Sequence, residues 1–343
     1  MMNRLIIVLT CLWAMPGVCA GTASPDEKDF LYAQMHGAEV MFVLKVVDDR
    51  AEAVPGADVW AGMPLYFSDG GGRALMLKTD RQGECVVRGR TTDLIPLFIS
   101  KDGYYSTELS YNFSVTESRP RVEKGRWMPF GDVRRVVLKK MRCPVLLNQP
   151  RPRGLPHVWR RIPAWGQWLD MDCEAFDWLP PYGKGQYGDM QVRFSKIERR
   201  RHLDFRYEMN VSFTNNPLAG VYVVGKDLTS DLHGPYHAET NGSAYASTYT
   251  YILDHLDSGK KHATETENSC FVFRTRTRVD ECGHLLSAHY GYIMGPWGMG
   301  RDRLVIGTSR FNPVPNDTNL EDEEGARRAW SNLRIFREHQ GKK

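Results

Sequence analysis

The sequence predicts an all-β protein made of two stacked-sheet domains, with one amphipathic helix at the C-terminal end. Short β-branched and apolar runs recur at roughly ten-residue spacing along most of the 343 residues. Glycine, proline, asparagine and aspartate separate these runs, which is typical of antiparallel sandwiches. A helical spacing of apolar residues follows near the end of the chain.

Composition limits the classes of function. The chain is 42% hydrophobic and 25% charged, so two domains of ordinary size can each bury a core. A formal net charge of +4 over this length predicts no nucleic-acid partner. We expect no cofactor either, because no P-loop, G-x-S-x-G or H-E-x-x-H motif occurs.

Residues 1–20 have the pattern of a cleavable signal peptide. Arg4 precedes the apolar stretch 5–15, and small residues lead to a cleavage position after Ala20. This stretch is shorter than the ~20 apolar residues that span a bilayer, and we expect no membrane span. The mature protein is therefore predicted to be exported: periplasmic, on the outer surface or secreted. Residues 21–37 are predicted to be an N-terminal linker.

Residues 38–141 are predicted to form the first sandwich. The run 40–47 (VMFVLKVV) is nearly all apolar, as expected of a buried strand. Turn residues then separate further expected strands at 58–67, 84–88, 95–100, 104–113 and 133–140.

Three segments of this domain carry a family resemblance. VLKVVDDRAEAVPGADVWAG, LKTDRQGECVV and LFISKDGYYST resemble the carboxypeptidase regulatory-like (transthyretin-like) β-sandwich. The resemblance implies an Ig-like sandwich over 38–141. It implies no specific activity, since such modules commonly act as spacers, stabilising domains or adhesion units.

Residues 142–170 are rich in proline and predict an extended linker. Residues 171–343 are predicted to form a larger, jelly-roll-like sandwich with the C-terminal helix. In the expected strand 270–279, phenylalanine and threonine alternate with Arg274, Arg276 and Arg278 on the opposite face. Other strands are expected at 189–197, 203–213, 219–224, 245–253, 285–294 and 303–311.

The C-terminal helix is predicted from its start signal and its apolar stripe. Thr318 and Glu321 have the spacing of a capping box. The stripe is expected to pack on the second sandwich, or else to bind a partner; it consists of Ala326, Ala329, Trp330, Leu333 and Phe336.

Aromatic residues around the proline-rich segment are the candidate ligand-binding residues. Flat aromatic rings exposed on a β-sandwich stack against sugar rings in binding modules. The same rings could instead dock the linker on its neighbouring domain. The predicted set is Trp165, Trp168, Trp178 and Tyr182.

Carboxylates near these rings allow several interpretations. Paired carboxylates beside aromatic residues fit a glycoside hydrolase, and alternating carboxylates also suit calcium. A solvated strand edge explains them without any chemistry. These carboxylates are Asp170, Asp172, Glu174 and Asp177.

Two further segments are distinctive in sequence. The glycines of 183–188 match G-x-G-x-x-G, but Pro180 and Pro181 precede them and a strand is expected to follow, so we predict a loop without nucleotide. The segments 177–185 and 312–317 resemble parts of an uncharacterised family of exported bacterial proteins, which implies no activity.

Five cysteines follow residue 20, an odd number with no C-x-x-C, so no disulfide pairing and no metal site is predicted.

The leading hypothesis is therefore a non-catalytic exported protein of the cell envelope, in which the second sandwich binds a glycan or another surface ligand. The alternatives are a secreted glycoside hydrolase that uses the carboxylates of 170–177 and a purely structural envelope protein. No catalytic residue is predicted, and the sequence does not decide the oligomeric state.

Overall fold

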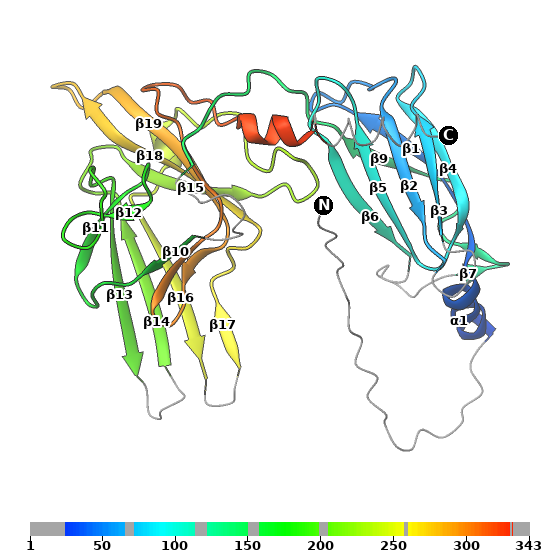
Figure 1. Ribbon diagram of the computed structural model, residues 1–343, viewed down its shortest axis with the longest axis horizontal. Helices are drawn as coiled ribbons and strands as arrows, with labels where there is room; N and C mark the ends of the chain where they lie inside the picture. The colour runs from blue at the N-terminus through cyan, green and yellow to red at the C-terminus, as the bar shows by residue number, and fades with distance from the viewer. Residues whose placement is uncertain are drawn as a thin grey trace.

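The computed structural model describes residues 25–65, 72–113, 122–149, 158–198, 205–256, 260–329 and 331. It confirms the predicted all-β class: two bodies of packed sheets are joined by loops, and a short helix near the C-terminus lies between them (Figure 1). The predicted signal peptide at 1–20 lies outside the described residues. No helix of the described residues is long and apolar enough to cross a membrane.

The first sandwich consists of two sheets that face each other across one core. One sheet contains β4 (Glu84–Thr91), β1 (Ala38–Val47), β9 (Asp132–Val137), β8 (Arg126–Trp127) and β7 (Val122–Glu123). The other has the order β3 (Arg73–Lys78), β2 (Asp58–Met63), β5 (Leu94–Ser100) and β6 (Thr107–Asn112). Alternate residues of β1 are fully buried against β2 and β5, which explains the apolar run that predicted this strand.

The predicted linker at 21–37 instead contains a helix, α1 (Pro25–His36), so this part of the prediction is wrong. Ala33 is buried, and the ring of Phe30 meets Trp127 edge-on with the ring centroids 6.0 Å apart. These contacts attach α1 to the end of the first core. A twelve-residue helix is marginal alone in water, so this packing accounts for its presence.

The second sandwich has three sheets around a larger core. The widest sheet has the order β12 (Asp177–Trp178), β11 (Trp168–Asp172), β13 (Met190–Glu198), β14 (Phe205–Ser212), β16 (Thr248–His255) and β17 (Lys261–Ala263). Opposite it lie β15 (Gly220–Gly225), β18 (Ser269–Val279), β19 (Leu285–Met294) and β22 (Ser309–Phe311). A small sheet of β10 (Val158–Arg161), β21 (Arg303–Ile306) and β20 (Trp297–Met299) completes the core.

The described parts of the proline-rich segment, residues 142–149 and 158–170, belong to this sandwich, so the prediction of an irregular linker is wrong for them. β10 pairs with β21, and β11 pairs with β13 from Trp168 to Met171. The one strand expected at 303–311 is also divided between β21 and β22, which belong to different sheets.

A β-bulge in β18 breaks the predicted alternation of this strand. Thr275 pairs with His289 and Arg278 pairs with Ser287, so two residues of β18 oppose one of β19. Arg276 lies in the bulge with φ +50°. Arg276 and Thr275 consequently contact the same carboxylate, that of Asp189, and the predicted separation of arginine and threonine faces fails here.

The C-terminal helix starts later than predicted, and the capping box does not form. Residues 323–329 are helical, and the Asp322 carboxylate accepts from the backbone N–H of Glu324 at 3.3 Å. Ala326 and Ala329 pack at the junction of the two sandwiches rather than on the second sandwich alone. Trp330, Leu333 and Phe336 lie outside the described residues.

Glu321, predicted to serve the capping box, instead joins the two sandwiches. Its carboxylate is buried and accepts from the Tyr105 hydroxyl at 3.0 Å. It also accepts from the backbone N–H groups of Arg142 and Cys143, both at 2.8 Å. An ion pair between Lys139 and Asp227 at 2.8 Å supports the same junction.

Candidate functional site

The four predicted ligand-binding aromatics do not form one surface. Trp178 is 3% exposed, belongs to the second core and donates its indole N–H to the Arg161 carbonyl at 3.0 Å. Its prediction as an exposed platform is therefore wrong. Trp165, Trp168 and Tyr182 are exposed, at 42%, 42% and 48%.

Trp165 and Trp168 lie on opposite faces of the widest sheet. Trp165 contacts the rings of Phe194 and Tyr207, both of which belong to the buried core. Trp168 pairs across the strands with Arg193, whose guanidinium lies 4.9 Å from the Trp168 ring centroid. Because side chains alternate along β13, Arg193 and Phe194 point to opposite faces. Only Trp168 of this pair belongs to the outer face.

The outer face of this sheet is polar around Trp168. The cross-strand register places Arg193, Asn210 and Thr250 in one row with Trp168. Thr250 donates to the Asn210 side-chain oxygen at 3.0 Å. At a strand spacing of about 4.8 Å, the row is roughly 14 Å long. It combines one flat aromatic ring with cationic, amide and hydroxyl groups.

A second row continues this polar surface. Asp170 and Gln191 are neighbours across the strands, and the Gln191 amide donates to Asp170 Oδ1 at 3.1 Å. Tyr182 follows β12 in the adjacent loop, where its hydroxyl accepts from the Gln167 amide at 3.2 Å. Together the two rows form the outer face, which contains Trp168, Arg193, Asn210, Thr250, Asp170, Gln191, Ser212 and Thr248.

Two of the four predicted carboxylates, those of Asp172 and Glu174, bind one arginine together with Asp189. The Arg276 guanidinium donates to Asp172 at 3.2 Å, to Glu174 at 2.7 Å and to Asp189 at 3.0 Å. It also lies over the ring of Tyr187, 4.0 Å from the centroid. Burial raises the pKa of Asp189, although the hydrogen bonds and charge of Arg276 oppose that shift. The sequence did not identify Arg276 or Asp189 as members of this group.

The glycine-rich loop 183–188 completes the same structure. Asp172 Oδ2 accepts from the backbone N–H groups of Gln186 and Tyr187 at 2.8 and 3.2 Å. A Cβ on Gly183 would lie 2.3 Å from the Trp178 carbonyl oxygen, so this close approach requires glycine. β13 follows the loop, in agreement with the prediction that this motif lacks the helix a nucleotide site needs.

A polar cavity of about 240 Å³ lies between the second sandwich and the C-terminal helix. His233 lines it, and its Nδ1 lies 2.7 Å from the Asp227 carbonyl oxygen. A carbonyl only accepts, so Nδ1 carries the proton and Nε2 keeps its lone pair. Burial lowers the pKa of His233 and raises that of Asp231, which lines the same cavity. The residues are distant in sequence, so no local pattern identifies the cavity.

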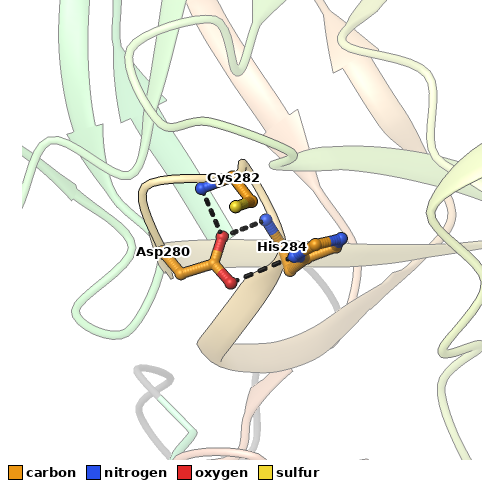
Figure 2. A group of neighbouring side chains, drawn as sticks. All are labelled: Asp280, Cys282 and His284. Atoms are coloured by element: carbon orange, nitrogen blue, oxygen red, sulfur yellow. Dashed lines mark hydrogen bonds and ion pairs between the residues drawn. The ribbon is translucent and has the colours of Figure 1, made fainter.

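Among the described residues, one group of metal-ligating side chains converges: Asp280, Cys282 and His284, in the turn between β18 and β19 (Figure 2). The five cysteines of the described residues are free, and Cys143 and Cys282 are exposed.

Comparison with known proteins gives no family. No family model matches the chain, and no curated protein matches it. Among solved structures, catechol 1,2-dioxygenase of Acinetobacter radioresistens is similar at 14% identity and a TM-score of 0.25, over 31% of this chain and 53% of that chain. Shaft pilin SpaA of Lactobacillus rhamnosus GG is similar at 9% identity and a TM-score of 0.20, over 71% and 89%. Neither likeness supports a functional conclusion.

Proposed function

We propose that this protein is a non-catalytic, exported binding protein that holds a glycan on the outer face of its second sandwich. The observation that carries the proposal is Trp168, which is 42% exposed in a polar row and has the guanidinium of Arg193 over one face of its ring. A sugar ring can stack its apolar face on the indole. Its hydroxyl groups can then bond to the neighbouring amide, carboxylate and guanidinium groups.

The engagement of the carboxylates supports a non-catalytic function over a glycoside hydrolase. A glycosidase needs one carboxylic acid and one carboxylate that both reach the substrate. Asp172 is 3% exposed and is used by Arg276 and by backbone N–H groups. Asp177 accepts from the backbone N–H of Lys184 and lies 3.6 Å from Arg160. Both carboxylates therefore have structural partners.

The test uses two tryptophans of equal exposure. Full-length mature protein is applied to a glycan array as wild type, Trp168→Ala and Trp165→Ala. We expect Trp168→Ala to reduce retention about tenfold, because a lost stacking contact is worth about 1.4 kcal/mol. Trp165→Ala is the matched control, since its ring contacts core residues on the other face, and it should retain glycan.

Other outcomes contradict the proposal. Equal loss of glycan retention in both variants would indicate that the substitutions damage folding rather than a binding surface. Unchanged retention by Trp168→Ala would exclude the outer face as the glycan-binding surface. Turnover of a glycoside panel by wild type, lost in Asp177→Asn, would favour the hydrolase instead. Failure of the wild type to bind any glycan would contradict the proposal and favour the third hypothesis, a purely structural envelope protein.

A further inference from the structure

Three turns of the described chain share one backbone conformation. They occupy residues 48–52, 80–84 and 280–284. In each turn the carboxylate of the first residue accepts from the backbone N–H groups of the third and fifth residues, at 2.7–2.9 Å. In each turn the fourth residue has a positive φ, between +68° and +83°. Its backbone N–H donates to the backbone carbonyl of the first residue. The turn therefore needs a side-chain acceptor such as that of aspartate at the first position, and it favours glycine at the fourth.

The third and fifth side chains are not required by this conformation. They are Arg50 and Glu52 in one turn, and Gln82 and Glu84 in another. In the turn 280–284 they are Cys282 and His284, which are a thiol and an imidazole beside the carboxylate of Asp280. Formation of the turn explains the aspartate and the glycine but not the cysteine and the histidine.

These three side chains converge at the tip of the β18–β19 hairpin. Their ligand atoms all lie within 4.8 Å of one another, as Figure 2 illustrates. Asp280 Oδ1 is fixed by the two backbone N–H groups, which leaves Oδ2 directed at the imidazole. His284 Nδ1 lies 3.0 Å from Oδ2. The ligands of a tetrahedral zinc ion lie roughly 3.3 Å apart, so little movement is needed.

We propose that the turn 280–284 binds Zn²⁺ through Asp280 Oδ2, Cys282 Sγ and His284 Nδ1. Thiolate and imidazole favour zinc over calcium or magnesium, and three protein ligands leave a fourth position for water. The His284 side chain is 78% exposed and that of Asp280 37%, so the ion has a direct path from solvent. The two backbone hydrogen bonds to Asp280 Oδ1 hold this carboxylate in one orientation, as hydrogen bonds from neighbouring groups do for metal ligands in general.

Binding of zinc releases one proton from the site. The Cys282 thiol releases its proton to solvent when the sulfur bonds the metal as thiolate. The imidazole stays neutral: Nδ1 gives up its proton to bind the ion, and the ring carries its single proton on Nε2 instead. Affinity should therefore fall as the pH is lowered.

The test is zinc titration of tag-free mature protein against a chromophoric chelator, with a reductant that does not bind zinc. Wild type should bind one equivalent, and Co²⁺ in its place should give a thiolate-to-metal charge-transfer band with tetrahedral visible bands. Cys282→Ser, His284→Ala and Asp280→Asn should each weaken binding at least about tenfold. Asp280→Asn keeps the Oδ1 acceptor, so the turn is expected to remain folded.

Cys143→Ser is the matched control, because Cys143 is also exposed and free. It should leave zinc affinity unchanged, whereas loss of binding in this variant would overturn the assignment. The absence of saturable binding by wild type, or unchanged affinity in Cys282→Ser, would also overturn it.

A transplant tests whether the turn is sufficient. In a Cys282→Ser/His284→Ala background, Gln82→Cys/Glu84→His converts the turn 80–84 to the same ligand pattern. This chain should regain one zinc equivalent, with the Co²⁺ spectrum of wild type. Failure to regain it would mean that groups outside the turn hold the ion, which refutes the three-ligand assignment.

Discussion

Replacement of Arg276 by alanine tests whether the carboxylates of the second sandwich are structural. The change removes the cation from Asp172 and Asp189, whose side chains are 4% and 1% exposed. Removing one partner of a buried ion pair costs about 3–5 kcal/mol, since the remaining charge stays buried. Glu174 adds little because its side chain is 33% exposed and solvent screens its charge. We therefore expect a loss of about 3–5 kcal/mol in the free energy of unfolding.

The loss should depend on pH in a defined direction. Burial already raises the pKa of Asp189, and removing Arg276 removes the influence that opposes this shift. A carboxyl group whose pKa is higher in the folded than in the unfolded state destabilises the fold when ionised. That penalty disappears as the pH falls below the unfolded-state value of 3.8. The difference between Arg276→Ala and wild type should therefore shrink as the pH is lowered toward that value.

The assay is urea unfolding followed by tryptophan fluorescence, since Trp178 and Trp297 are buried in the second core. Arg278→Ala is the control, because Arg278 is an exposed neighbour in β18, and its effect should stay within about 0.5 kcal/mol. A loss below about 1 kcal/mol in Arg276→Ala, or a loss independent of pH, would refute the structural interpretation of these carboxylates.

Two further predictions concern the junction. Glu321→Ala should lower the free energy of unfolding by about 3–5 kcal/mol, because it leaves three donors without their acceptor. Tyr105→Phe removes one of these hydrogen bonds and should cost about 1 kcal/mol. Equal losses for the two variants in urea unfolding would contradict this prediction. Burial tends to raise the pKa of Asp227, but the hydrogen bond and charge of Lys139 outweigh it and lower the pKa to about 2. This pair should contribute about 1–2 kcal/mol above pH 3.8, lost as the pH falls toward 2, and Asp227→Asn should abolish that pH dependence.

The sequence predicted the strands that carry a full apolar or alternating pattern. β1, β5, β13, β18 and β19 all lie within a few residues of their expected positions. Shorter strands such as β10, β11 and β20 were missed, because their residues give too short a pattern and proline-rich neighbours obscure it. Their pairing depends on partners far along the chain, as in β10 with β21.

The candidate sites were less predictable than the fold. Trp168 and Trp178 have the same residue type and similar neighbours, and only the registers of β11 and β12 decide that one is exposed and the other buried. The Arg276 cluster depends on a bulge, which shifts a side chain between faces without any local sequence signal. The turn 280–284 is a local pattern, but the spacing of its aspartate, cysteine and histidine predicts no metal site until the backbone turn brings their ligand atoms together.

The junction is completed by residues that follow the last described strand of either sandwich. Glu321 lies beyond every strand of both sandwiches, yet it binds backbone N–H groups at 142 and 143 and the Tyr105 hydroxyl. During synthesis the strands of both bodies therefore emerge before Glu321 adds its bonds to the ion pair of Lys139 and Asp227 at the same junction. A chain shortened before residue 321 would retain every strand and lose this connection, so dissection of the protein into fragments must keep its C-terminal segment.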